Sequence, residues 1–215
     1  MAGTLEKPVL HVEGIDDQHS IVHLLTRHGI SFEPATRLVD IKVQGNDVKV
    51  LEAMPTAVRA STNRAVGFVI DADVVVPDRW AQVCARLRPL GLVLPEAAPA
   101  AGYIGELTAL RSRVGIWLMP DNVMDFGKLE DLLKTLVPPG DPIIAHAEAS
   151  TDAASDRGAL FAAKDRIKAV MHTWLAWQKK PGVPFGIALQ AEFFSKDSAA
   201  ALRFVEWFRH LYHIF

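Results

Sequence analysis

The stretch GFVIDADVVVPDRW, residues 67–80, decides the fold class of this chain. Its first residues form a mostly apolar run that predicts a fully buried strand. The run continues directly into Asp71 and Asp73, and a helix is expected to begin at about Pro77. Carboxylates are costly to bury, so two of them at the end of a buried strand call for an explanation.

The sequence before this stretch alternates strand and helix patterns. An apolar run at 7–14 ends in glycine, and residues 16–29 place apolar side chains on one helical face. A strand-like stretch at 36–45 is followed by a helix that opens with Asn46 as its N-cap. Strands that alternate with helices imply right-handed crossovers. We therefore predict an α/β fold with a Rossmann-like, mainly parallel sheet flanked by helices.

The second half is expected to add one buried strand, at 112–122, and then to be mainly helical. Residues 89–103 are rich in proline and glycine, which favours a loop, a short edge strand or both. Trp174 and Trp177 are interpreted as core aromatics, and the aromatic C-terminus packs either in its own core or against a second copy. The predicted helices lie within 127–140, 154–182 and 198–215.

Composition bounds the class of protein. The chain has 215 residues, of which 50% are hydrophobic, enough to bury the core of one domain. We expect a single domain over 1–215, with a core at about 7–137 and a helical C-terminal extension at about 155–215. The net charge of −2 means that any contact with nucleic acid must come from a local basic patch.

Cysteine usage and hydropathy point to a location. The single Cys84 excludes an internal disulfide and a cysteine-cluster metal site. No apolar run has the pattern of a signal peptide or the roughly 18 residues of a membrane span. We therefore expect a cytoplasmic protein without a membrane partner.

Acidic residues follow three of the predicted strands. Glu13 ends the first, Asp71 and Asp73 end the third, and Asp121 follows the strand at 112–122. Because the carboxyl ends of parallel strands share one edge of the sheet, these acids are expected to converge. Two carboxylates about 4 Å apart repel by roughly 4 kcal/mol at an effective dielectric near 20. Shared protons or a hard cation such as Mg²⁺ must offset that repulsion.

The acidic strand ends resemble the Toprim domain, which topoisomerases, primases and several nucleases share. VLHVEGIDD followed by VGFVIDADVV matches its pattern, in which a glutamate and a glycine end a first strand and Asp-x-Asp ends a later one, within a four-stranded parallel core. Here Glu13 and Gly14 match the first element, and Asp71 and Asp73 match the second.

Further segments extend the resemblance to about residues 7–210. Asp17 corresponds to a second acid found in the overcoming-lysogenization-defect nucleases, and Glu130 in GKLED to a downstream acid of that branch. The segments LMPDN, GKLED and KAVMHTWLA resemble a group of stand-alone Toprim-like proteins.

The resemblance implies Mg²⁺- or Mn²⁺-dependent hydrolysis or transfer of phosphodiester bonds in nucleic acid, with DNA favoured over RNA. Glu13, Asp71 and Asp73 are expected to hold one ion, and Asp17 and Glu130 to help hold a second. Paired ions clamp the attacking and leaving oxygens of an in-line displacement. Glu13 is also a candidate general base or acid.

A lysine near the scissile phosphate would stabilise charge in the transition state, and Lys168 is the first candidate, with Lys164 second. Because the two are four residues apart on one predicted helix, a solvated helix surface is an equally simple interpretation.

Structural interpretations of the individual acids stay open. Asp17 has the position of a helix-capping residue, and Glu130 that of a first-turn acid. Asp121 and Asn122 have the composition of a turn after a strand, and either could instead contribute to a metal site.

Two other functions also stay open. FVIDADVV fits the motif of haloacid-dehalogenase-type phosphatases, with Asp71 as nucleophile and Asp73 as acid/base. The alternative without catalysis is a Toprim-like subunit that binds metal and nucleic acid. The chain has no G-x-x-x-x-G-K-[ST] motif, so an ATPase partner is one expectation, and a homo-oligomer is another.

Overall fold

The computed structural model describes residues 7–73 and 75–215. In this part of the chain five strands form one sheet in the order β2-β1-β3-β5-β4. The first four in this order are parallel neighbours, and β4 is an antiparallel edge strand. The predicted α/β class, with a mainly parallel sheet flanked by helices, is confirmed. The strands are β1 (Val9–Val12), β2 (Asp40–Val43), β3 (Ala65–Asp71), β4 (Tyr103–Leu107) and β5 (Ser112–Met119).

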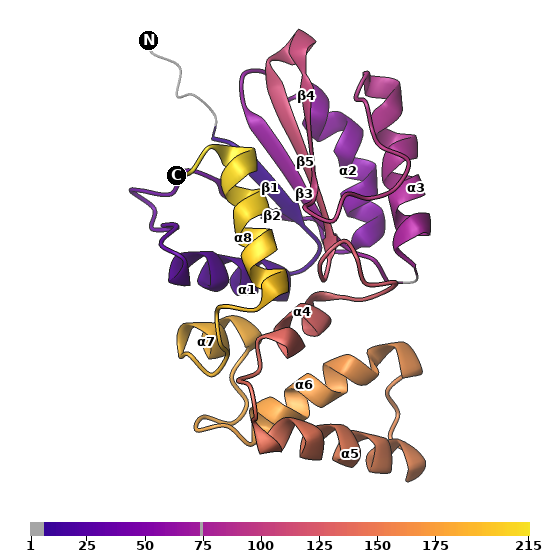
Figure 1. Ribbon diagram of the computed structural model, residues 1–215, viewed down its shortest axis with the longest axis vertical. Helices are drawn as coiled ribbons and strands as arrows, with labels where there is room; N and C mark the ends of the chain where they lie inside the picture. Colours follow the sequence, from indigo (N-terminus) through magenta and orange to yellow (C-terminus); the bar gives the residue numbers. More distant parts are fainter. Residues whose placement is uncertain (1–6, 74) are drawn as a thin grey trace.

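Helices cover both faces of the sheet (Figure 1). α2 (Asp47–Arg59) and α3 (Val76–Leu87) contribute to the core on one face, and α1 (Ile15–Arg27) and α8 (Ala199–Tyr212) to the core on the other. Side chains of β3 alternate between the two faces, as a strand in a three-layer protein requires. Phe68 and Ile70 belong to the α2–α3 core and Val69 to the α1–α8 core.

Two glycines let α8 lie directly against the sheet. Gly67 on β3 and Gly115 on β5 are register partners. A Cβ atom at either position would lie 2.8 Å or 2.4 Å, respectively, from the side chain of Leu211. The C-terminal segment, expected as part of an extension, therefore closes one face of the sheet.

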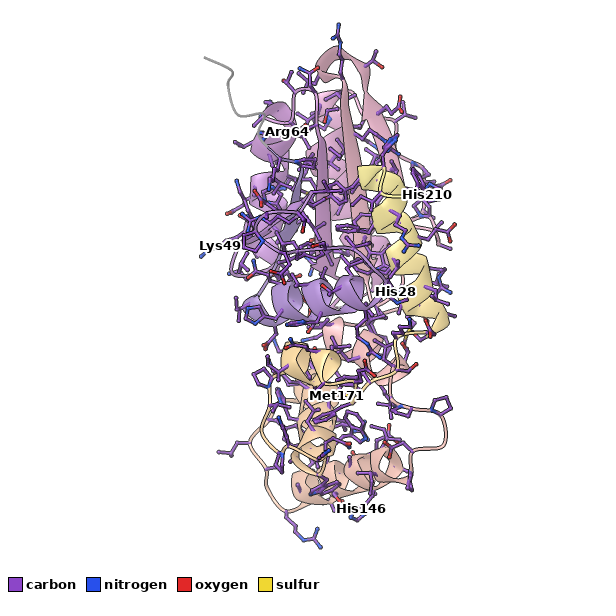
Figure 2. The ribbon with its side chains drawn as sticks, turned by 90° about the vertical axis from the view of Figure 1, so that its left-hand side faces the viewer. His28, Lys49, Arg64, His146, Met171 and His210 are labelled. Atoms are coloured by element: carbon purple, nitrogen blue, oxygen red, sulfur yellow. The ribbon has the colours of Figure 1, made fainter. Side chains whose placement is uncertain are left out.

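The aromatic residues of α8 pack inside this chain and not on an exposed surface. Phe204, Trp207 and Phe208 are all buried, and the indole N–H of Trp207 donates a hydrogen bond to the backbone oxygen of Tyr103 on β4 at 3.1 Å. Figure 2 shows α8, marked by His210, running beside the sheet.

The remaining helices lie beyond the carboxyl ends of the parallel strands (Figures 1 and 2). They are α4 (Leu129–Thr135), α5 (Pro142–Asp156), α6 (Arg166–Ala176) and α7 (Phe185–Gln190). α5 and α6 pack on each other, α4 packs on α6, and α7 packs on α1. This layer therefore faces the edge of the sheet where the acidic strand ends were expected.

The prediction of one long helix within 154–182 is wrong. α5 ends at Asp156, Gly158 has a positive φ of 93°, and α6 begins only at Arg166. Leu160, which was expected on the buried stripe, is fully exposed. The beginning of α5 was not predicted, although the sequence contains a local signal for it. Asp141 caps the helix by accepting the N–H of Ile143, and Pro142 occupies the first turn.

Trp174 within α6 and Trp177 at the C-cap of the same helix differ in burial. Trp174 is fully buried, as expected, whereas Trp177 is 45% exposed and its ring stacks on His146 at 5.1 Å. The prediction that Trp177 is a core residue is therefore wrong, because this residue caps the end of α6 and its side chain is partly exposed to solvent.

None of the described helices is both long and apolar enough to cross a lipid bilayer.

Replacing Leu211 by alanine is expected to destabilise the protein by about 2–5 kcal/mol, because it leaves a cavity between α8 and the glycine pair. Urea unfolding followed by circular dichroism measures this loss. The matched control is Leu160→Ala, which removes the same atoms from a fully exposed side chain and should change stability by less than about 0.5 kcal/mol. Equal effects of the two substitutions would contradict the packing of α8.

Candidate functional site

The strand ends and the helix starts that follow them enclose a cavity of about 340 Å³, called here the acidic cavity. Glu13 follows β1 and Asp71 ends β3, while Asp17 lies in the first turn of α1 and Glu130 in the first turn of α4. All four line the cavity, together with Lys168. The fold thus brings five of the six predicted site residues to one place.

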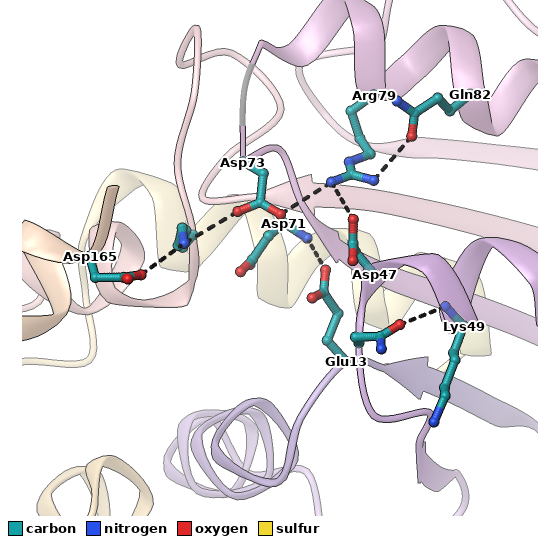
Figure 3. A network of polar contacts seen from close by, with 10 residues as sticks. Glu13, Asp47, Lys49, Asp71, Asp73, Arg79, Gln82 and Asp165 are labelled. Carbon is teal, nitrogen blue, oxygen red and sulfur yellow. Dashed lines mark hydrogen bonds and ion pairs between the residues drawn. The ribbon is translucent and has the colours of Figure 1, made fainter. Parts of the chain in front are cut away.

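A hydrogen bond joins the ends of two neighbouring strands. The backbone N–H of Asp71 donates to Oε1 of Glu13 at 2.7 Å (Figure 3). β1 and β3 are adjacent and parallel, so their carboxyl ends reach the same edge of the sheet. This pairing explains why acids that are far apart in the sequence are neighbours in the structure.

Burial and crowding raise the pKa values of these carboxyl groups. Burial is the largest cause for Glu13, whose pKa rises to about 7, and for Asp17, whose pKa rises to about 6. Neighbouring carboxylates raise both pKa values further, against backbone N–H groups that lower them. Burial, followed by the charges of Glu13, Asp17 and Glu130, also raises the pKa of Asp71 well above its ordinary value.

One oxygen of this cluster lacks a hydrogen-bond donor. Oδ1 of Asp71 is buried, and no partner for it exists among the residues that the structure describes. A buried carboxylate oxygen is stable only with a proton, a donor or a cation. The position therefore suits a bound cation.

Asp73 lies at the rim. A positive φ of 55° turns the chain after Ala72, so its carboxylate lines a neighbouring cavity and not the acidic one. There it accepts a hydrogen bond from Arg79 at 3.2 Å and pairs with Lys128 at 3.3 Å (Figure 3). Its charge still raises the pKa of Glu13 and of Asp71.

Arg79 is a site residue that sequence reasoning missed. It is 6% exposed, and it also bonds to Asp47 at 2.9 Å and to Gln82 at 3.1 Å. The signal was a cationic residue in the first turns of the helix that follows Asp-x-Asp. Its effect is to hold the side chain of Asp73 away from Asp71.

The lysines divide between the two cavities. Lys168 lines the acidic cavity, with its Nζ 3.9 Å from Oε1 of Glu130, whereas Lys164 lines the neighbouring cavity. Lys128, which was also missed, lines both and lies 3.3 Å from Asp73 and 3.6 Å from Asp165. Its place directly before the acids of the GKLED segment was the available signal.

Asp17 is both a capping residue and a wall of the cavity. Its Oδ2 accepts the backbone N–H of Gly14 at 2.8 Å, which caps α1. Glu130 is a first-turn acid of α4 and is buried against the same cavity. Asp17 and Glu130 therefore each have a structural position at a helix start and also line the acidic cavity.

Asp121 and Asn122 form the turn after β5 and do not line the acidic cavity. Asp121 accepts the backbone N–H groups of Val123 and Met124 and pairs with Arg203 at 2.6 Å. Asn122 is buried and accepts the N–H of Leu118 at 2.7 Å. The expected convergence of Asp121 with the other acids is therefore wrong, since its carboxylate pairs with Arg203 on α8 and does not line the acidic cavity.

The donor set fits a hard divalent cation in kind, since it consists of carboxylate oxygens around an unpartnered Oδ1. Across residues 7–73 and 75–215, no three His, Cys, Asp or Glu side chains are already grouped as ligands of one ion.

The fold and the site define an α/β protein with an acidic cavity at the carboxyl edge of a mainly parallel sheet. A family model described as "Protein of unknown function (DUF3226)" matches residues 7–213, so the chain belongs to this family. No curated protein and no solved structure matches the chain.

Without divalent cations, the free energy of unfolding is expected to fall as pH rises from about 4 to about 7. The raised pKa values of Glu13 and Asp17 mean that the folded state binds protons more tightly than the unfolded state, so this stabilisation is lost as the groups ionise. A carboxyl group whose pKa is higher by one in the folded state contributes about 1.4 kcal/mol to this change. Urea unfolding in EDTA across this pH range measures the slope.

The variant Glu13→Gln removes one of the titrating groups and should flatten that slope. Glu52→Gln, which changes an exposed glutamate on α2, is the control and should leave it unchanged. Identical slopes for Glu13→Gln and the wild type would show that the carboxyl of Glu13 is not strained by burial and crowding.

Proposed function

We propose that this protein is a Mg²⁺-dependent nuclease of the Toprim type, which hydrolyses or transfers phosphodiester bonds of nucleic acid. The supporting observation is the convergence of Glu13, Asp17, Asp71 and Glu130 on one cavity that Lys168 also lines. The order of the acids along the chain is the one that the Toprim resemblance implies. DNA is the first expected substrate and RNA the second.

The acidic cavity supplies the ligands for Mg²⁺ or Mn²⁺. Asp71 and Glu13 are the primary ligands, and Asp17 and Glu130 are available to a second ion. The carboxylate of Asp73, which lines the neighbouring cavity, would have to turn away from Arg79 and Lys128 to join them. When bound, such ions hold the phosphate and stabilise the charge that develops on its oxygens. Burial is the main cause of the raised pKa values and repulsion between the carboxylates is the second, and a bound cation would offset both.

Glu13 is the proposed general base or acid. The N–H of Asp71 fixes its Oε1, which leaves the other carboxylate oxygen to exchange a proton. Without a cation, burial raises the pKa of Glu13 to about 7, and a bound cation would favour its carboxylate form, which is the form that acts as a base.

Lys168 is the proposed cation for the phosphate. Its side chain is half exposed and lies at the mouth of the cavity beside Glu130. A lysine at this distance can turn from the carboxylate toward a bound phosphate and stabilise its negative charge. Lys128, between Asp73 and Asp165, adds a second positive charge at the same rim.

The proposal places this activity in the cytoplasm. A separate ATPase is a proposed partner, because no P-loop motif is present in the sequence, and a second copy of the chain is another. Both partners are testable by purification from the native source under gentle conditions.

Incubation with Mg²⁺ or Mn²⁺ and plasmid, single-stranded DNA or RNA should give metal-dependent cleavage. Asp71→Asn and Glu13→Gln are each expected to lower its rate by about 100-fold or more. The matched controls Asp156→Asn and Glu52→Gln alter exposed acids outside the cavity and should cleave at the wild-type rate. Absence of cleavage of every substrate would refute the proposal, and hydrolysis of a simple phosphate monoester that depends on Asp71 would favour the phosphatase instead.

Binding of Mn²⁺ should be measurable by calorimetry without any substrate. Asp71→Asn removes the unpartnered Oδ1 as an anionic ligand and should weaken binding by roughly 10-fold or more, whereas Asp156→Asn should not. Equal affinities of the two variants would mean that the ion is held elsewhere.

A further inference from the structure

A second cavity, called here the basic cavity, lies beside the acidic one and has a volume of about 280 Å³. It is formed by the loop before α4 together with the beginning of α6. Lys128 lines both cavities, and Asp73 at the end of the Asp-x-Asp turn lines the basic one. The two cavities are therefore immediate neighbours.

Positive charge dominates the basic cavity. Four cationic side chains line it against only two carboxylates. Asp73 is already paired with Arg79 and Lys128, and Asp131 accepts the backbone N–H of Lys128 at 2.9 Å. In a chain with a net charge of −2, this is the kind of local basic patch that contact with nucleic acid requires. The cationic side chains are Lys128, Lys134, Lys164 and Arg166.

The cations of this cavity are available to an anion. Lys164 is exposed, and in the described part of the chain it makes no ion pair or hydrogen bond. Arg166 binds Asp152 through two contacts of 2.6 Å and 2.7 Å, and Lys134 pairs with Glu148, but both pairs are largely exposed to solvent. Exposed ion pairs contribute little to stability, so a phosphate can replace either carboxylate.

An exposed aromatic side chain completes the wall. Phe126 lines the basic cavity and is 60% exposed. Val123 and Met124 of the same loop are also exposed. The loop is fixed in place, because the carbonyl of Gly127 accepts the N–H of Asp73 at 3.2 Å and that of Asp125 accepts the N–H of Val76 at 2.9 Å. These hydrogen bonds position the loop, so the exposed ring of Phe126 is available for stacking with an aromatic ligand.

Cations that follow the phosphates, combined with an aromatic side chain for the bases, form the usual surface for single-stranded nucleic acid. A base can stack on a side chain only where it is unpaired. The cavity, at about 280 Å³, has the size of one small molecular unit and not of a base pair with both of its backbones. Charge and shape together thus favour an unpaired nucleotide over a double helix.

We propose that the basic cavity binds one unpaired nucleotide of the substrate strand, with its base on Phe126 and its phosphate on Lys164 and Arg166. The strand then passes Lys128 and presents the adjacent phosphodiester to the acidic cavity. This inference rests on the proposed nuclease function and narrows its substrate to single-stranded DNA or RNA.

Fluorescence anisotropy of the full chain in EDTA tests this binding apart from cleavage. The probes are a short labelled oligothymidylate, the matching oligouridylate and a DNA duplex of the same length, so that the first two distinguish DNA from RNA. The single strands should bind more tightly than the duplex. Phe126→Ala should weaken single-strand binding by roughly 10-fold, and Phe126→Trp should restore it because an aromatic face returns.

Lys164→Ala should weaken binding and lower the slope of log affinity against log salt by about 0.7. Phe215→Ala and Lys180→Ala remove an exposed aromatic and an exposed cation elsewhere and should bind like the wild type. Wild-type binding by both Phe126→Ala and Lys164→Ala, or equal affinity for duplex and single strand, would overturn the inference. Single-strand binding that depends on these residues without any cleavage would support the inference and refute the nuclease proposal alone.

Discussion

The candidate site depends on the parallel pairing of β1 with β3, which ends in a hydrogen bond from the backbone N–H of Asp71 to the carboxylate of Glu13. Adjacent parallel strands deliver their carboxyl ends to one edge, so each strand contributes an acid to the same cavity. The first turns of α1 and α4 add Asp17 and Glu130 to that edge. The acidic cavity is thus a direct consequence of strand order.

A cluster of carboxylates is stable only if its negative charge is compensated. The carboxylates of this cluster differ in how many cationic side chains contact them. Asp73 has two cations, since Arg79 and Lys128 both contact it. Asp71 has none in direct contact among the residues described, and burial, followed by the neighbouring carboxylates, raises its pKa. The least compensated carboxylate therefore lines the acidic cavity, where a bound divalent cation would stabilise the folded protein.

The basic cavity lies on one side of the acidic cavity, so the charge of the site changes sign from one side to the other. The two cavities share Lys128, so under the proposed function a strand bound on the cationic side would present its neighbouring phosphate to the carboxylates. For the DUF3226 family, whose description assigns no function, this pairing offers a chemical hypothesis that rests on named residues. The exposed Phe126 adds a preference for unpaired bases to that hypothesis.

The sequence by itself determined the α/β class, the strands that end in acids and the helix caps, because periodicity and capping are local properties that nearby residues fix. Only the tertiary structure decided which acids share a cavity. Asp73 itself has a left-handed backbone conformation, which turns its side chain to the rim of the site. Asp121 pairs with Arg203, which lies far along the chain on α8. These outcomes depend on backbone turns and on partners far along the chain, so no local pattern contains them.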